Sequence, residues 1–323
     1  MKFPHRRQFL HLAAASAALP AMSRIAQAQA YPTRPVRIIV GFPAGGVADT
    51  VARLLGDQIG RSQGQRMLIE NRAGAGGVIG TEAASRAAPD GSTLALISTD
   101  LLVPPHLRKL NYDLLTDFEP ICELVSAPTV IIVNSASPYR TLADLLSAAR
   151  AKPGNLTAAS AGQTHQIALE MLRRAAKIEM TIVPYPGGAP AVNALLGGHV
   201  TSALLSYSTA SEQLKAGKLR ALATFSRTRI EALPELPTVA ESGYSDSEMD
   251  EWLGMLAPAK TPNEKVSQLV GWLTEALQAP ELRAKFASLG LYSVGMCGAE
   301  FAAFLRKQYG DFGRIIREAN IKE

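Results

Sequence analysis

Glycine-rich turns recur where a predicted strand runs into a predicted helix, and such turns can bind an anion. The first, GFPAGGVAD, covers residues 41–49. Glycines there let several backbone N–H groups point into one cavity, and the N-terminus of the following helix adds a positive partial charge. The Gly-Lys-Ser/Thr of a Walker loop is missing, and the spacing is not the dinucleotide GxGxxG. The loop therefore indicates a site for a small anion, although an ordinary tight turn has the same composition.

Two further turns occupy the same strand–loop–helix position later in the chain. They are ASAGQTH at 159–165 and PYPGGAP at 184–190. Ligands of parallel sheets bind beyond the carboxyl ends of the strands, so turns from two halves of the chain could close on one ligand. A glycine-rich run at 74–80 could add further amides, or could be a turn that packs a helix closely against a strand.

Some residues of these segments have a plain structural explanation as well. His165 could hydrogen-bond its own loop at a helix start, whereas Tyr185, between Pro and Gly, is expected to line a cleft. Ser160 does not stand in a GxSxG elbow, which argues against a hydrolase nucleophile. The acidic run 246–251 is expected to be a solvated loop.

The elements that must position the turns follow an α/β pattern, in which short β-branched runs alternate with amphipathic stretches. Thr141 and Asp144 form a potential capping box at a helix start, and Thr261 and Glu264 form another. The last third of the chain is rich in predicted helices. The predicted strands are 36–40, 67–70, 93–97, 156–159, 180–183, 200–205 and 219–224.

Cysteine and histidine usage gives no sign of a metal centre. Cys122 and Cys297 could pair in an oxidising compartment, but their apolar surroundings favour two buried thiols. The histidines beyond residue 30 are not at metal-ligand spacing. We expect no metal and no cofactor.

The first 30 residues have the order of a signal peptide. A basic start is followed by a short apolar run and by an AxA-like site near Ala30, and the arginine pair at 6–7 resembles a twin-arginine signal. The chain of 323 residues carries 33 basic and 28 acidic residues, and this segment holds four basic and no acidic ones. The mature charge is therefore +1, which argues against nucleic acid as a partner. We expect cleavage near Ala30 and a periplasmic location.

About 293 residues remain, which is enough for two lobes. No low-complexity linker separates them, so we expect strand crossovers and a hinge. The predicted lobes are 31–127 with 226–323, and 128–225.

The motifs together resemble the receptors of tripartite tricarboxylate transporters, also called Bug proteins. Residues 31–49 are similar to the start of that family, and ENRAGAGG at 70–77 matches its ENRPGAGG-type run. Shorter motifs follow in family order along essentially the whole mature chain: PDG at 89–91, YD at 112–113, DF at 117–118, ASAG at 159–162, VPY at 183–185, LGG at 196–198 and AP at 257–258.

The resemblance implies a type II Venus-flytrap fold, a periplasmic-binding-protein architecture of two lobes, each a mostly parallel sheet flanked by helices. It also implies a monomeric receptor, without enzymatic activity, that captures a small carboxylate and delivers it to the permease subunits of a tripartite transporter. The ligand would be held largely by backbone amides. Carried over to this chain, the ligand-binding residues are Phe42, Ala44, Gly45, Gly46, Asp49, Ser160, Gly162, Thr164, His165, Tyr185 and Gly187.

Three departures from the family pattern bear on the ligand. The loop before His165 is shorter by about two residues, and Pro186 replaces a common Lys. Many relatives carry an Asp where Leu205 stands, and that Asp could pair with a ligand amine. Its loss favours a di- or tricarboxylate or an aromatic carboxylate over an amino acid.

Two rival functions remain open at this point. The first is an exported α/β hydrolase acting on a small carboxylate ester through Ser160 and His165, which lack an obvious acid partner. The second is the effector portion of a transcription factor, which would require a helix-turn-helix where the predicted signal peptide stands.

Overall fold

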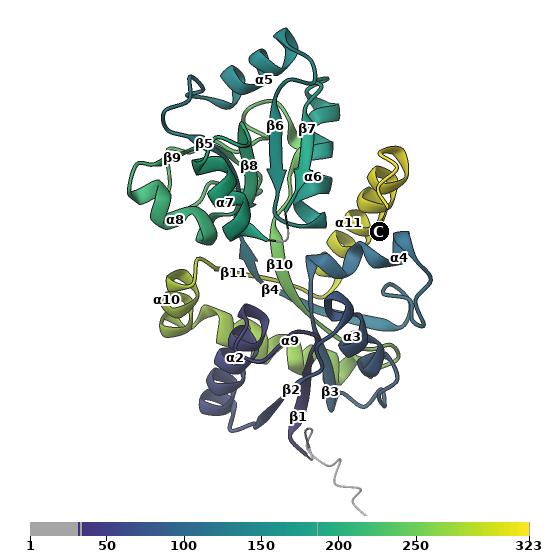
Figure 1. Ribbon diagram of the computed structural model, residues 1–323. Coiled ribbons are helices and arrows are strands. Elements are labelled where there is room, and N and C mark those ends of the chain that lie inside the picture. The colour runs from purple at the N-terminus through teal and green to yellow at the C-terminus, as the bar shows by residue number, and fades with distance from the viewer. Residues whose placement is uncertain (1–31, 33, 186, 323) are drawn as a thin grey trace, which may run out of the picture. The chain divides into compact units, whose positions relative to one another are not determined.

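The computed structural model describes residues 32, 34–185 and 187–322. All the helices and strands described lie in one compact unit, Pro35–Glu323 (Figure 1). The predicted signal peptide and Pro186 lie outside the described residues. None of the helices in the described part of the chain is long and apolar enough to cross a bilayer.

The first sheet has six strands in the order β11-β4-β10-β3-β1-β2. Strands β1 to β4 run in one direction, while β10 and β11 run in the other. The strands are β1 (Val36–Val40), β2 (Met67–Asn71), β3 (Thr93–Ser98), β4 (Phe118–Ala127), β10 (Glu251–Pro258) and β11 (Tyr292–Cys297).

The α-helices of this half of the molecule begin at glycines or prolines. Helix α2 starts directly after Gly46 and ends at Gly64, whose left-handed backbone lets its N–H bond the carbonyl of Gly60. The face of α2 that carries Val51 and Leu55 is buried. The elements are α2 (Val47–Gln63), η1 (Ala75–Gly77), α3 (Val78–Ser85), η2 (Thr99–Leu102), α4 (Pro104–Leu107), η3 (Ser245–Ser247), α9 (Asn263–Gln278), α10 (Pro280–Ser288) and α11 (Ala299–Glu318).

The second sheet has five strands in the order β7-β6-β8-β5-β9. Strands β6 to β9 run in one direction and β5 runs in the other. The predicted capping box at Thr141 and Asp144 is confirmed at the start of α5. The strands are β5 (Thr129–Asn134), β6 (Thr157–Ser160), β7 (Thr181–Pro184), β8 (Ser202–Ser206) and β9 (Leu219–Thr224), and the helices are α5 (Leu142–Ala151), α6 (Gln163–Ala175), α7 (Gly188–Leu196) and α8 (Tyr207–Lys215).

The fold is therefore the predicted two-lobed α/β fold of the periplasmic binding proteins, with one helix-flanked sheet in each lobe (Figure 1). Neighbouring strands are parallel in β3-β1-β2 and in β7-β6-β8 and antiparallel in the other pairs, so both sheets are mixed and the expectation of mostly parallel sheets is met only in part. The chain passes from β4 to β5 through Pro128, and from β9 to β10 through residues 225–250. The exact limits of the two lobes stay a prediction.

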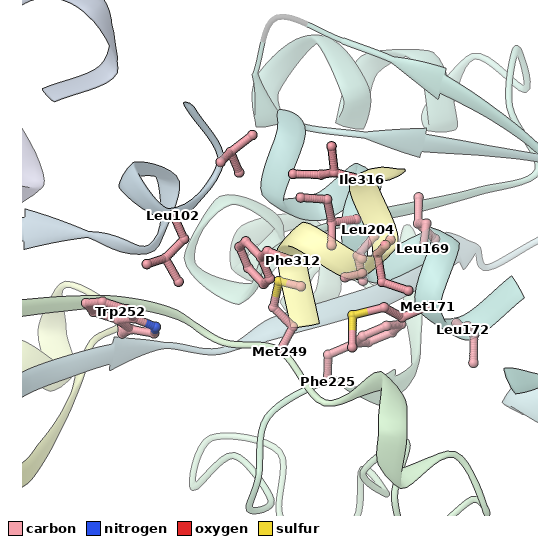
Figure 2. Packing of buried hydrophobic residues seen from close by; sticks show 14 of the residues in the cluster. Leu102, Leu169, Met171, Leu172, Leu204, Phe225, Met249, Trp252, Phe312 and Ile316 are labelled. Carbon is pink, nitrogen blue, oxygen red and sulfur yellow. The ribbon is translucent and has the colours of Figure 1, made fainter. Parts of the chain in front are cut away.

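One buried apolar cluster contains residues of both sheets. Figure 2 shows Phe312 and Ile316 of α11 beside Leu169 and Met171 of α6. Helix α11 also packs on β4, so it contacts the first sheet and a helix that flanks the second. Burial of large side chains stabilises a fold by about 1.5–3 kcal/mol each. The C-terminal helix therefore contributes to the packing of both halves.

Cys122 of β4 and Cys297 of β11 form a disulfide. The expectation of two buried thiols is wrong. The two residues are direct register partners on adjacent antiparallel strands, although 175 residues separate them in the chain. Sequence spacing carries no trace of that pairing, because it is created by the sheet.

Buried charged residues lie on β4 and on the segment 225–250 that connects β9 to β10. Glu123 is fully buried and accepts two hydrogen bonds from Nη2 of Arg227, at 3.0 and 3.2 Å. Burial nevertheless raises the pKa of Glu123 to about 7. Burial likewise raises the pKa of Asp250 to about 6, and the hydroxyl of Ser226 donates a hydrogen bond to its carboxyl. Both acids are therefore costly to ionise in the folded chain.

Candidate functional site

A cavity of about 330 Å³ lies beside the N-terminus of α2. Its walls come from the ends of β1, β3, β4 and β8, from the start of β10, and from the segment between α10 and β11. The lining residues are Phe42, Pro43, Gly46, Val47, Ala48, Ser98, Thr99, Asp100, Val125, Ala127, Ser206, Ser208, Glu251, Trp252, Leu253, Leu289 and Leu291.

Asp49 shapes the loop that precedes α2. Its Oδ2 accepts a hydrogen bond from the backbone N–H of Gly45 at 2.9 Å and another from Nε of Arg53 at 2.9 Å. The Arg53 hydrogen bond lowers the pKa of Asp49 to about 2, against the opposing effect of burial. Gly45 has φ of +82°, a conformation that L-residues adopt rarely. The buried carboxylate of Asp49 therefore fixes the conformation of the loop through the N–H of Gly45.

The glycine-rich run at 74–80 supports this loop by close packing. A Cβ added at Gly80 would lie 2.7 Å from Cα of Gly41, and one added at Gly41 would lie 2.7 Å from Cα of Gly77. Only glycine permits such an approach of two backbones. Of the two explanations for this run, close packing is therefore the one that the geometry favours.

Side chains of α6 and β8, which belong to the second half of the molecule, contact acidic side chains that line the cavity. The hydroxyl of Thr164 donates a hydrogen bond to Oδ1 of Asp100 at 2.5 Å. The hydroxyl of Ser206 donates one to Glu251. Nε2 of His165 lies 3.7 Å from Oε1 of Glu251. Thr164 and His165 of α6 and Ser206 of β8 thus contact acids that line the cavity.

The residues predicted from the sequence fall into three groups. Phe42 and Gly46 line the cavity, while Ala44 and Gly45 are exposed in the same loop, with Asp49 buried beneath it. In the turn after β6, Ser160, Thr164 and His165 are buried and Gly162 is exposed. Tyr185 and Gly187 are partly buried and are not among the described residues that line the cavity.

Tyr185 has a structural role that the sequence did not indicate. Its backbone N–H donates to the carbonyl of Ser160 at 2.9 Å, and its side chain packs against the apolar core of the second sheet.

Sequence reasoning missed the polar residues of the cavity, among them Asp100, Ser206 and Glu251. Asp100 follows β3 directly, so the rule that ligands lie at the carboxyl ends of strands could have found it. Glu251 belongs to the run 246–251, and the expectation of a solvated loop there is wrong, since Asp246 alone of this run is exposed. Asp250 is buried, and Glu251 begins β10 at the cavity wall.

Ser160 and His165 are poorly arranged for a hydrolase. Ser160 has no exposed surface, and among the residues that the structure describes neither its Oγ nor Nε2 of His165 has a hydrogen-bond partner. Among the described residues, no group of three or more His, Cys, Asp or Glu side chains could hold a metal ion.

A larger cavity, of about 780 Å³, lies elsewhere in the molecule. It is formed by the start of α5, the end of α8, β9 and residues 232–237. Its lining contains none of the predicted ligand-binding residues, and the N-terminus of α5 that borders it is already capped by the side chains of Thr141 and Asp144, so we place the site at the smaller cavity.

The fold and the cavity together define a two-lobed solute-binding protein. A family model described as the tripartite tricarboxylate transporter family receptor matches residues 51–321, and the chain belongs to that family. The resemblance found in the sequence motifs is thereby confirmed. The family is one of substrate-binding receptors rather than enzymes.

Individual relatives agree over nearly the full length. BugT of Bordetella pertussis is 34% identical over 302 residues, which cover 91% of this chain and 92% of that protein. The solved structure of the periplasmic binding protein BugD is 33% identical with a TM-score of 0.67, covering 90% of this chain and 99% of the other.

Two solved structures similar to this chain contain ligands. A protein of Rhodopseudomonas palustris solved with adipate is 29% identical with a TM-score of 0.69, covering 90% of this chain and 99% of the other. MatC from the same organism, solved with bound malate, is 28% identical with a TM-score of 0.66, covering 88% and 100%.

Proposed function

We propose that this chain is an exported periplasmic receptor that captures a small carboxylate at the N-terminus of α2 and delivers it to the permease of a tripartite transporter. The proposal includes cleavage near Ala30, a monomeric receptor and binding without chemical change of the ligand. A di- or tricarboxylate or an aromatic carboxylate is the ligand class that the sequence favours. The adipate and malate complexes of relatives support a small carboxylate as the common element.

The observation that carries the proposal is the open N-terminus of α2 at the cavity. The first-turn amides of an α-helix have no partner within the helix, and Val47 and Ala48 of that turn line the cavity. Seventeen residues of α2 provide an aligned dipole that favours a negative charge there.

The expected strength of binding is compatible with such a site. Each charge-assisted hydrogen bond contributes about 1.5–3 kcal/mol. A micromolar receptor needs about 8 kcal/mol in total. About three to five amide and hydroxyl donors therefore suffice without an arginine clamp. Closure follows if the ligand binds the closed form better than the open one.

Val47→Asp tests the position of the carboxylate. Val47 is the first residue of α2, lines the cavity and is 57% exposed. An Asp in the first helical turn is favourable to the helix, so the variant should fold. Its negative charge should repel a bound carboxylate and weaken binding at least tenfold. Val47→Asn is the matched control, with a similar side chain and no charge, and should bind nearly as tightly as the parent.

The ligand for this test comes from a thermal-shift screen of succinate, malate, adipate, citrate and benzoate with the parent protein. A ligand at about 100 times its Kd adds about 2.7 kcal/mol of stability, which shifts Tm by several degrees. Equal affinity of the Asp and Asn variants would contradict the assignment of the carboxylate to α2. No stabilisation by any carboxylate would contradict the proposed function.

A further inference from the structure

The larger cavity, of about 780 Å³, lies along the free edge of the second sheet. β9 is the last strand at that edge, and Leu219, Ala221 and Leu222 of β9 line the cavity (Figure 1). The start of α5, the end of α8 and residues 232–237 form the rest of the wall. An edge strand presents backbone N–H and C=O groups that have no neighbouring strand, so another chain can pair with it.

The backbone of β9 alternates between groups that bond β5 and groups that point away from the sheet. In and beside β5, Thr129 and Ser135 hydrogen-bond the residues that flank β9, so the odd-numbered residues of β5 face it. Because an antiparallel ladder alternates, the β9 residues opposite the even-numbered ones direct their N–H and C=O groups outward. These outward residues are Thr224, Ala221 and Leu219.

The outward groups of Thr224 already pair with another segment. The N–H of Thr224 donates to the carbonyl of Pro237 at 2.9 Å, and its carbonyl accepts from the N–H of Val239 at 2.8 Å. Thr224 and Thr238 thereby form a parallel β-bridge. The pairing stops there because Pro237 has no N–H and residues 230–236 fold into turns. One bridge therefore shows that this edge accepts an added strand.

The outward groups of Ala221 and Leu219 have no such partner. Among the residues that the structure describes, no backbone or side-chain group hydrogen-bonds them. Ala221 is only partly buried, and both residues line the cavity, so there is space for a chain beside them. The unpaired groups continue the line of the bridge at Thr224.

The walls of the cavity suit apolar side chains on both faces of an added strand. Leu142 and Leu222 belong to the apolar cluster on one face of the second sheet, and β5 contributes alternate residues to this cluster and to the one on the other face. Leu214, Leu233 and Leu236 pack with the second cluster. Because side chains of a strand alternate between the two faces, successive apolar residues of an added strand would each meet an apolar wall.

The rim of the cavity is cationic. Arg140 and Lys215 line it and are exposed, and Glu235 is the single acid among the described lining residues. Neither cation forms a salt bridge within the described part of the chain. The carboxyl of Asp144, close to Arg140, accepts hydrogen bonds from the backbone N–H groups of Arg140 and Thr141. Acidic residues on either side of an apolar run would therefore complement this rim.

From these features we infer that the free edge of β9 is a docking site for an extended, acidic segment of a partner protein, which adds a strand to the second sheet. The outward groups of Ala221 and Leu219 bond its backbone, the apolar walls take its side chains, and Arg140 and Lys215 pair with its acids. The docking site is separate from the ligand site at α2, because the described lining residues of the two cavities have no member in common.

A phage-displayed library of random peptides, selected on the immobilised chain, tests the docking site. Enriched peptides should carry a short apolar run with Asp or Glu on both sides. A synthetic peptide of the most enriched sequence is then N-methylated at either of its two sets of alternate residues. One set should weaken binding at least tenfold in fluorescence anisotropy, because it supplies the N–H donors to β9, and the other set should have little effect.

Variants of the chain assign the peptide to β9. Arg140→Gln combined with Lys215→Gln should weaken binding at least tenfold, and Lys109→Gln combined with Lys285→Gln, at exposed positions elsewhere, is the matched control and should bind like the parent. Ala221→Pro removes an outward N–H but no bond to β5, which edge strands tolerate, and should also weaken binding at least tenfold. The surface variants keep the test valid should Ala221→Pro fail to fold.

Each contrary outcome is distinct. A selection that enriches no peptide, or peptides that bind these variants as tightly as the parent, would overturn the docking site at β9. Equal binding of the two N-methylated forms would overturn strand addition. A dimer of the chain in light scattering that dissociates in Ala221→Pro would show that a second copy occupies the edge, and would overturn the assignment to a partner protein. The proposed carboxylate site at α2 is unaffected by all of these results.

Discussion

Nε2 of His165 lies 3.7 Å from Oε1 of Glu251, and this approach joins α6, beside the second sheet, to β10 of the first. Thr164, the residue before His165, bonds Asp100, which follows β3. One helix start thus faces two acids from two neighbouring strands. A receptor that closes on its ligand needs contacts of this kind between its lobes, and here they surround the proposed site.

Trp252 should report ligand binding by its fluorescence. It lines the cavity and is 2% exposed, whereas the other tryptophan, Trp272, lies in α9 and is not among the described lining residues. In Trp272→Phe, Trp252 is the remaining tryptophan, and a carboxylate that stabilises the parent in the thermal-shift screen should change its emission. The Kd from this fluorescence titration should equal the Kd measured by isothermal titration calorimetry. In Trp252→Phe the same titration should leave the emission constant. A signal that follows Trp272 instead would place the ligand elsewhere.

Asp49→Asn should destabilise the chain by about 1 kcal/mol at neutral pH, since the loop loses a charged acceptor of two hydrogen bonds. The pKa of Asp49 is lowered from 3.8 to about 2, so its contribution is complete above pH 3.8 and is lost as the pH falls to 2. Urea unfolding at pH 7 and at pH 2.5 should therefore show a difference between parent and variant that shrinks in acid.

Asp57→Asn is the matched control for that experiment, because Asp57 is exposed on the same helix. It should change the stability little at either pH. A difference between the parent and Asp49→Asn that stays constant down to pH 2 would refute the role given to the Asp49 carboxylate.

Glu123→Gln should remove a pH dependence of stability. Burial raises the pKa of Glu123 from 4.5 to about 7, so the neutral acid is stabilising below pH 4.5 and this contribution is lost as the pH rises through 7. The size is about 3 kcal/mol. The free energy of unfolding of the parent should fall relative to that of the Gln variant between pH 4.5 and 8.

Glu119→Gln, on the same strand but exposed, should show the same pH dependence as the parent. Parallel curves for Glu123→Gln and the parent over this range would contradict the raised pKa.

The double variant Cys122→Ala with Cys297→Ala should lose about 2–5 kcal/mol of stability, the usual cost of removing a native disulfide. Reduction of the parent by dithiothreitol should lower its stability by a similar amount and leave the double variant unaffected. Two results together would show that the cysteines are not paired. They are an unchanged stability of the parent on adding dithiothreitol, and two free thiols detected in the unfolded chain before any reduction.

Local signals in the sequence predicted local structure well. At Thr141 the capping box is confirmed, with Asp144 N–H donating to Oγ1 at 3.1 Å. At Thr261 the same pattern is wrong: the N-cap of α9 is Pro262, and the Thr261 hydroxyl donates to the carbonyl of Pro258 at 2.7 Å. The bend before α9 offers that hydroxyl a closer acceptor, which the spacing of residues does not reveal.

Features created by pairing between distant strands were beyond sequence reasoning. The seven predicted strands are present, whereas β4, β5, β10 and β11 were not predicted. β10 pairs with β3 and β4, more than a hundred residues away, and this places Glu251 at the same cavity as Asp100. The separate pairing of β11 with β4 makes Cys122 and Cys297 register partners. The glycine-rich loop at α2 was predicted because its signal is contained within nine residues. Asp100 and Glu251, which line the same cavity, were not predicted because they lie far apart in the sequence.

The central claim is that the ligand carboxylate binds at the N-terminus of α2. A crystal structure of the chain with the tightest-binding carboxylate of the screen tests it most directly. The account predicts the ligand carboxylate within hydrogen-bond distance of the backbone N–H groups of Val47 or Ala48, inside the cavity that Gly46 and Glu251 line. A ligand bound in the larger cavity beside α8, or one that turns its carboxylate away from α2, would contradict it.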